Sequence, residues 1–378
     1  MIQLNSPQDC CGCAACVQRC PQQCITMCED EEGFLYPRID TSLCIDCGLC
    51  EKTCPVLNPD TPHEPLKVFA AKNADEDIRR ASSSGGVFTL LAEAVIGRGG
   101  VVFGARFDEH WEVEHAYTDT IEGLKDFRGS KYVQSRVGNT YHEAEMFLKG
   151  GREVLYSGTP CQIAGLRHYL RKEYTKLILV DFICHGVPSP GVFRHYLNET
   201  LALNNMPILT GVSFRDKRLG WKKFSFSLTV SEGDGKNKVI LSESKYRNIF
   251  LKGFLCDLYL RPSCHACPFR SFRSGSDITI ADFWAINDFF PKENDHLGYS
   301  LCILHSDIKI PCKLYPLDIS KACPPNSAIY RSPISHKNRN RFFSEHAKAR
   351  KVIPLIKKYA TIPLKRKIIL KIASILKN

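Results

Sequence analysis

The stretch from Cys10 to Pro55 opens with CCGCAACVQRCP and closes with CIDCGLCEKTCP. Each run places four cysteines at C-x2-C-x2-C-x3-C and follows them with a proline. The eight cysteines in this pattern are Cys10, Cys13, Cys16, Cys20, Cys44, Cys47, Cys50 and Cys54. Three thiols spaced two residues apart can wrap one corner of a small metal cluster, while the fourth points away. The proline then ends any helix and fixes the turn.

This spacing is typical of bacterial ferredoxins with two [4Fe–4S] clusters, in which the fourth cysteine of each run ligates the other cluster. We therefore predict that each triplet shares a cluster with the last cysteine of the other run: Cys10, Cys13 and Cys16 with Cys54, and Cys44, Cys47 and Cys50 with Cys20. Structural zinc is the alternative, but it usually takes pairs of C-x2-C. Cys11, Cys24 and Cys28 lie outside the pattern and are interpreted as packing or spare thiols near the clusters.

Composition places the chain among globular proteins of the reducing cytoplasm. Its 378 residues suffice for two or three domains, and a hydrophobic content of 44% is ordinary. No apolar run approaches the ~20 residues of a membrane helix. The N-terminus MIQLNSPQDCC lacks a charged region followed by an apolar one, so we predict no signal peptide. Nineteen cysteines with metal-type spacing indicate a cytoplasmic protein rather than a secreted disulfide-bonded one.

The net charge of +11 is concentrated in the last residues of the chain. From Lys337 to Asn378, thirteen Lys and Arg face one acid, Glu345, so this stretch carries +12 and the remainder sums to −1. A neutral body argues against nucleic-acid binding. The tail also has an apolar helical stripe at Leu364, Ile368, Ile372, Ile375 and Leu376. Two interpretations stay open: a basic amphipathic helix at the inner membrane face or on a partner, or a terminal helix packed on the body.

We predict an α+β protein with three parts: a ferredoxin domain at 1–63, an oxidoreductase domain at 64–330 and a basic helical tail at 331–378. Asn58–Pro65 is a polar, proline-rich linker. Strands are expected at 68–72, 101–107, 153–158 and 176–184, with the last central and covered on both faces. Helices are expected at 82–100, capped by Ser82–Ser84, and after Pro160. This strand–turn–helix order favours a mixed α/β core.

Beyond Pro207 the pattern changes to antiparallel strands, written VSFRD, FSFSLTV and VILSES. An apolar helix is expected at 248–260, with Cys256 inside it, and a further strand at 277–281. Residues 285–330 give no useful prediction.

Four further cysteines stand at the ends of expected elements: Cys161, Cys184, Cys264 and Cys267. The first two directly follow strands, and residues at the ends of parallel strands converge in space. Cys161 also begins a helix, where the dipole favours a thiolate. A third [4Fe–4S] cluster, a zinc site and unrelated buried thiols all stay open at this point.

Seven segments in order resemble the family of beta subunits of coenzyme F420 hydrogenases and dehydrogenases: SSSGGVF (82–88), GSKYVQS (129–135), SGTPCQIAGLR (157–167), ICHGVPSP (183–190), FRDKRLGW (214–221), SCHACPF (263–269) and DITIADFW (277–284). The resemblance runs from about residue 5 to 345. It implies an iron–sulfur flavoprotein with FAD, family modules at about 66–145 and 146–330, and a third [4Fe–4S] cluster on the four additional cysteines. Family members reduce deazaflavin coenzymes or chlorophyll-type pigments, or are encoded beside polysaccharide genes. Here His185 and Gly186 replace the bulkier or acidic residues typical of deazaflavin-reducing members, so that substrate is not assumed.

The flavin is expected at glycine-containing turns. Candidates for holding it are Ser83, Ser84, Gly85, Gly86, Lys131, Tyr132, Gly158, Thr159, Gln162, Asp282 and Phe283. The serines and glycines can present N–H groups to a pyrophosphate at a helix start, although this is not the G-x-G-x-x-G fingerprint. For each residue a turn or surface role is the alternative. Arg215, Lys217 and Trp221 either bind an anionic substrate or pyrophosphate, or form a basic hairpin.

The predicted function is a flavin-dependent oxidoreductase. It passes electrons between ferredoxin-type clusters and FAD, with hydride transfer to or from an organic acceptor. His185 and Tyr132 are the candidate proton donors. The expected partners are an electron donor or acceptor protein and an unidentified small molecule, in a homo-oligomer or a larger complex. One alternative is an electron-transfer subunit without its own small substrate. The other is a ferredoxin module fused to a non-redox sugar-modifying or scaffold domain, without flavin.

Overall fold

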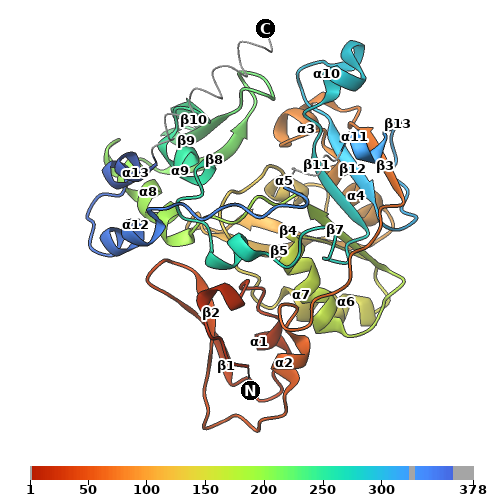
Figure 1. Ribbon diagram of the computed structural model, residues 1–378. Helices are drawn as coiled ribbons and strands as arrows, with labels where there is room; N and C mark the ends of the chain where they lie inside the picture. The colour runs from red at the N-terminus through yellow and green to blue at the C-terminus, as the bar shows by residue number, and fades with distance from the viewer. Residues whose placement is uncertain (1, 323–327, 361–378) are drawn as a thin grey trace.

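A computed structural model describes residues 2–322 and 328–360 of the protein (Figure 1). The first part contains a 3-10 helix η1 (Pro7–Asp9), α1 (Ala15–Arg19), β1 (Ile25–Glu29), β2 (Leu35–Ile39) and α2 (Leu49–Thr53). The strands β1 and β2 pair antiparallel, and α1 packs against α2. Each short helix ends at the last cysteine of its run, because Cys20 and Cys54 are extended C-caps. The two cysteine runs therefore build two copies of one local structure.

An eight-stranded sheet forms the centre of the remaining chain, in the order β13-β3-β12-β11-β7-β6-β4-β5. Its strands are β3 (Lys67–Ala71), β4 (Val101–Phe107), β5 (Val113–Thr118), β6 (Val154–Ser157), β7 (Leu177–Phe182), β11 (Ile278–Asp282), β12 (Ser300–Leu304) and β13 (Leu314–Pro316). Neighbouring strands β4, β6, β7 and β11 are parallel, so their carboxyl ends lie at one edge of the sheet. The apolar strand predicted at 176–184 is β7, and its central place is confirmed.

Helices cover both faces of this sheet: α4 (Val87–Gly97), α5 (Leu124–Phe127), α6 (Thr140–Lys149) and α7 (Pro160–Leu170). The short helix α3 (Glu76–Ala81) precedes α4, and α8 (Pro190–Ala202) packs in the core of the second sheet described below. Alternate residues of β4 point to opposite faces. Val102 packs with α4 on one face, and Phe103 packs with α6 and α7 on the other. The second of these cores also contains Cys11 and Cys13. The cysteine-rich part is thus packed directly against α7, as Figure 1 shows at the bottom of the molecule.

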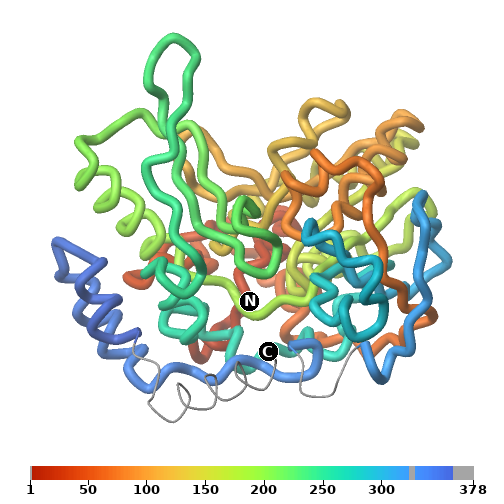
Figure 2. Tube along the Cα trace, turned by 90° about the horizontal axis from the view of Figure 1, so that it is seen from above, coloured from red at the N-terminus to blue at the C-terminus, as the bar shows by residue number. Residues whose placement is uncertain are grey.

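A second sheet stands apart from the first and consists of β8 (Leu209–Asp216), β9 (Ser225–Gly233) and β10 (Lys236–Ser244) in antiparallel order. It packs with α9 (Ile249–Leu255) and, at the C-terminal end of the chain, with α12 (Arg339–His346) and α13 (Ile353–Tyr359). In Figure 2 these blue helices lie on the same side as the green strands. The remaining elements are η2 (Pro262–Ala266), α10 (Ile286–Phe289), η3 (Pro291–Glu293) and α11 (Ile319–Ala322).

The described part of the basic tail is packed on the body, because Phe342 and Ile356 are fully buried. The apolar stripe predicted from Leu364 to Leu376 lies outside the described residues. No helix in the described ranges has the length and apolar character needed to span a bilayer.

Two local predictions were wrong. Ser82–Ser84 do not cap the following helix: its N-cap is Gly86 in the left-handed conformation, and the serine hydroxyls bond elsewhere in the protein. The helix predicted at 248–260 ends at Leu255, and Cys256 is its C-cap rather than an interior residue. In both cases tertiary contacts override the local pattern.

Asp181 on β7 makes stability depend on pH. Its side chain is 3% exposed, and burial raises its pKa to about 6. The folded state therefore holds the proton more tightly than the unfolded state, so stability falls as pH rises from about 4 to about 6. We expect the unfolding free energy of Asp181→Asn, minus that of the wild type, to rise by about 3 kcal/mol between pH 4 and pH 7. Denaturant titrations across this range measure the difference, and parallel curves contradict the prediction.

Candidate functional site

The structure brings together the four thiols predicted for the first cluster. The Cys16 thiol interacts electrostatically with those of Cys10 and Cys54, and the Cys13 thiol with those of Cys10 and Cys16. Burial is the main cause that raises the pKa of Cys16 to about 12. Cys54 comes from the second run, so thiols of both runs meet in this group, as the predicted exchange of ligands would require; Cys50 also lies close to Cys16.

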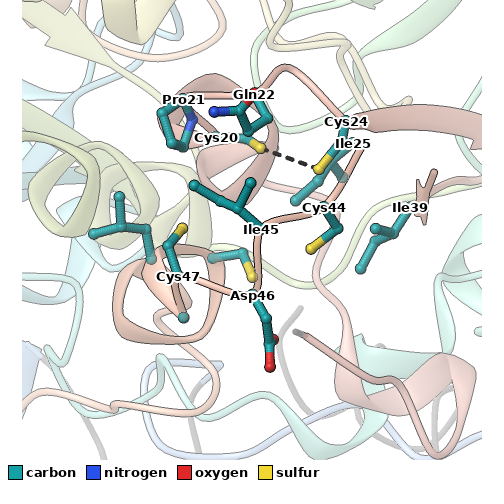
Figure 3. A pocket seen from close by; sticks show the side chains of 13 residues that line it. Cys20, Pro21, Gln22, Cys24, Ile25, Ile39, Cys44, Ile45, Asp46 and Cys47 are labelled. Atoms are coloured by element: carbon teal, nitrogen blue, oxygen red, sulfur yellow. Dashed lines mark hydrogen bonds between the residues drawn. The ribbon is translucent and has the colours of Figure 1, made fainter. Parts of the chain in front are cut away.

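The thiols predicted for the second cluster line one cavity: Cys20, Cys44, Cys47 and Cys50. Figure 3 shows Cys20, Cys44 and Cys47 around this hollow, together with Cys24. The Cys24 Sγ lies 3.4 Å from the Cys20 Sγ. Cys47 is solvent-exposed, so this cavity lies at the protein surface.

The four additional cysteines line another cavity, which we call the third cavity because the third cluster is predicted there: Cys161, Cys184, Cys264 and Cys267. Electrostatic interactions connect every pair of these thiols. They meet because β6 and β7 are adjacent parallel strands. Cys161 lies in the first turn of the helix after β6, and Cys184 lies just beyond β7. Burial raises the pKa of Cys264 to about 12. Binding of a metal cluster here would therefore have to displace protons.

The donor set of both cavities fits iron–sulfur clusters. Each cavity is lined by its four predicted ligand thiols, the number that a [4Fe–4S] cluster takes, and by one further cysteine, Cys24 in the one and Cys11 in the other. Within the described residues, no group of three His, Cys, Asp or Glu side chains has the arrangement that would hold a metal ion. In each case the thiols line one common cavity.

One turn of α7 connects the first and third thiol groups. Cys161 and Gly165 are four residues apart on this helix and so share a face, about 6 Å along the axis. A Cβ atom at Gly165 would lie 2.8 Å from the Cys13 Cβ and 3.0 Å from its Sγ. The Cys11 thiol interacts electrostatically with Cys13, is close enough to Cys161 to affect its pKa, and lines the third cavity. The two groups are therefore held in contact.

Several residues predicted to bind flavin meet around Arg215, which is 5% exposed. Its guanidinium donates to both carboxylate oxygens of Asp282 (2.8 and 2.9 Å), to the Tyr132 hydroxyl (3.1 Å) and to the Ser83 carbonyl (3.0 Å). Trp221 also donates to Asp282, at 2.8 Å, and stacks on Trp284 with ring centroids 4.6 Å apart. The sequence predicted these groups separately, and the fold joins them into one network.

Lys217 belongs to the same region. Its Nζ donates to the carbonyls of Arg79, Ser84 and Leu297, each at 2.7 Å, and burial lowers its pKa to about 7. The segment FRDKRLGW is therefore not a solvated basic hairpin, because the side chains singled out from it are all buried: Arg215, Lys217 and Trp221.

Other predicted flavin residues have structural partners. Thr159 and Gln162 form the capping box of α7, with Gly158 directly before it. Phe283 is 2% exposed within the core. Lys131 donates to two backbone carbonyls.

The start of α4 fits a phosphate group better than the start of α7. Gly86, the N-cap of α4, has φ +79° and offers no side chain to the first-turn N–H groups. The preceding Gly85 is required by the sheet, because a Cβ there would lie 2.6 Å from the Ala71 carbonyl oxygen. Ser83 and Ser84 use their hydroxyls on Ser130 and on the Tyr299 carbonyl. Only the backbone of this turn is therefore available to a ligand.

The two candidate proton donors both pack against the ring of Phe254. His185 Nε2 is 2.6 Å from Asp257 Oδ1, and its ring packs edge-on against Phe254. Tyr132 packs against the same phenylalanine, with centroids 4.9 Å apart. Asp257 was not predicted from the sequence, because an isolated acid in an apolar segment has no spacing that identifies it.

Two arginines in the third cavity were also missed. Arg261 and Arg270 line the cavity with the four thiols. Single arginines carry no motif, so only the folded structure places them there.

Comparison with known proteins agrees with this geometry. A sequence model of 4Fe-4S dicluster domains matches residues 9–58. Two further models describe the N-terminal and C-terminal parts of the coenzyme F420 hydrogenase/dehydrogenase beta subunit, and they match residues 68–140 and 151–309. The chain is therefore an iron–sulfur protein with a ferredoxin-like domain followed by a mixed α/β fold. It belongs to the family of coenzyme F420 hydrogenase/dehydrogenase beta subunits.

Individual relatives cover different parts of the chain. One subunit of the F(420)H(2) dehydrogenase of Methanosarcina mazei is 26% identical over 68% of this chain and 71% of its own length. A 7Fe ferredoxin of Hydrogenibacillus schlegelii is 42% identical over 16% of this chain and 77% of its own length. A chain in the F420-reducing [NiFe] hydrogenase complex of Methanosarcina barkeri is 14% identical, with a TM-score of 0.44, covering 79% of this chain and 91% of that one.

Proposed function

We propose that the protein is an FAD-dependent iron–sulfur oxidoreductase with three [4Fe–4S] clusters. It exchanges electrons through its ferredoxin domain and transfers hydride to or from an organic acceptor, either a deazaflavin coenzyme or another small molecule, with a link to polysaccharide synthesis. The observation that supports this most is the third cavity, where four thiols from three distant segments surround one space beside the first thiol group. Bound clusters supply one-electron transfer and a bound flavin supplies the conversion to hydride chemistry.

The protein's own residues would hold these groups as follows. The two cysteine runs hold the ferredoxin clusters, and Cys161, Cys184, Cys264 and Cys267 hold the third. Because α7 packs on the loop of Cys13, the ferredoxin domain is held at fixed distance from the third cavity. Fixed spacing and exclusion of water are what the protein contributes to electron transfer.

For the flavin, the uncapped first turn of α4 is the proposed pyrophosphate contact, with the Arg215 network beside it. Arg215 Nε is buried without a hydrogen-bond partner, whereas the other guanidinium nitrogens are all used. His185 and Tyr132 are the proposed proton-exchanging groups, and Asp257 fixes the orientation of His185.

The relative from Methanosarcina mazei is named as a subunit of a dehydrogenase. This name supports a second candidate function, in which the chain is an electron-transfer subunit of a complex and passes electrons to a partner without a small substrate of its own.

Anaerobic purification with iron, sulfide and flavin quantified tests the proposal. We expect about twelve iron ions per chain, four for each of three clusters, with one FAD. About eight iron ions without flavin would leave the ferredoxin domain in place and contradict both the third cluster and the oxidoreductase activity. Full iron and flavin without turnover of any small acceptor, but with reduction of a protein partner, would favour the second candidate function.

A further inference from the structure

Arg261 is a buried charge without an acidic partner. Four arginines are buried among the described residues, and three of them pair with carboxylates: Arg79 with Asp295, Arg215 with Asp282, and Arg339 with Glu32. Arg261 is the most buried of the four, at 0% exposure. Within the described ranges, it has no acidic side chain within the 4.0 Å of an ion pair.

Polar contacts fix Arg261 in place but leave its charge uncompensated. It donates to the carbonyls of Cys10 (2.8 Å) and Leu35 (3.0 Å) and to the Gln134 side chain (2.9 Å), and it lies over the Tyr36 ring at 4.2 Å. All of these partners are neutral. Because a buried charge without a counter-charge is strongly disfavoured, an anion is expected nearby.

Arg270 is a second cation of the same cavity. It donates to the carbonyls of Cys184, His185 and Ala328, and its Nε is buried without a hydrogen-bond partner. It too has no acidic partner within ion-pair distance in the part of the chain that the structure describes. Two cations in one cavity make the need for an anion stronger.

The two guanidinium groups face different thiols. Arg261 acts electrostatically on Cys161 and Cys264, whereas Arg270 acts on Cys184 and Cys267. All four predicted ligands of the third cluster are thus divided between the two arginines. By contrast, the lining of the second cluster's cavity includes Asp46 and contains no Lys or Arg.

We propose that Arg261 and Arg270 are the counter-charges of an anionic cluster in the third cavity and make it easier to reduce than the second cluster. The inference rests on the proposed third cluster. A [4Fe–4S] core carries less positive charge than its four thiolates carry negative charge, so each added electron makes the anion stronger. Burial alone opposes that addition, and two fixed positive charges favour it.

Potentiometric titration of the whole chain, followed by electron paramagnetic resonance with dithionite as the one-electron donor, tests this inference. In Arg270→Gln we expect about twelve iron ions to remain. At the wild-type midpoint of the third cluster, the ratio of reduced to oxidised cluster should fall about tenfold, which for one electron is 59 mV. Arg270→Lys keeps the charge and should keep the midpoint. Arg98→Gln, at a surface pair with Glu153, is the matched control and should change nothing.

The outcomes separate this inference from the proposed function. About eight iron ions in the wild type would show that the third cluster itself is absent, and both proposals would fall. Two outcomes would leave the third cluster in place and overturn the role of the arginines. One is full iron with an unchanged midpoint potential in both Arg270→Gln and Arg261→Gln. The other is a third cluster that is no easier to reduce than the second. Loss of four iron ions in Arg270→Gln, with full iron in Arg270→Lys, supports the counter-charge. Equal loss of iron in Arg270→Gln and Arg270→Lys would show that Arg270 supports the structure of its loop, and would overturn its role as a counter-charge.

Discussion

Replacing Cys264 by alanine is expected to remove about four of twelve iron ions while the two ferredoxin clusters stay in place. Cys264 belongs to the group of four predicted ligand thiols that lines the third cavity. The electron paramagnetic resonance spectrum should lose one component. If the proposed function holds, reduction of the organic acceptor should also fall by several orders of magnitude.

Cys312→Ala is the control for this change. Cys312 is a half-buried thiol that packs in the core of the opposite face of the sheet, away from the cavity. It should keep its full iron content and its activity. If the Cys264 variant also retained about twelve iron ions, the assignment of the third cluster to this cavity would be wrong.

Replacing Gly165 by leucine is expected to release the first cluster from its place against α7. The side chain would enter space that is filled by Cys13 and by the Tyr141 hydroxyl, which lie 2.8 and 2.9 Å from an ideal Cβ. Overpacking of this size costs about 3 kcal/mol or more. The iron content should fall by about four ions, because the Cys13 thiol is displaced.

Gly97→Leu is the matched control, because Gly97 ends α4 and a Cβ there meets nothing within 4 Å. It should keep all iron and gain up to about 1 kcal/mol from helix propensity. Thermal unfolding and iron content measure both variants. Equal stability and iron in the two would show that the contact of α7 with the cysteine-rich part is not structurally important.

The sequence predicted the elements whose information is local. The ferredoxin-like part follows from the spacing of the two cysteine runs, and the central strand β7 follows from its apolar sequence. The structure contains both. The two short helices α1 and α2 also explain why the fourth cysteine of each run points away. Cys20 and Cys54 lie just beyond these helices, as C-caps with extended backbone.

The rest depends on contacts between distant segments. Ser82–Ser84 look like helix caps, but their hydroxyls bond to Ile78, Ser130 and Tyr299, which no local pattern contains. The strand β12 was missed because Ser300–Leu304 follows a long irregular segment. Arg261 has no motif of its own, and its importance appears only when residues 10, 35 and 134 surround it.

The contact between α7 and Cys13 also constrains the order of events during synthesis of the chain. The eight cysteines of the ferredoxin runs lie within the first 54 residues, whereas the third cavity needs residues as far as Cys267. At roughly 5–20 residues per second, Cys267 leaves the ribosome on the order of ten to forty seconds after Cys54. The first clusters are therefore expected to load on the nascent chain, before α7 closes over Cys13, and the third only after translation has passed the last of its thiols.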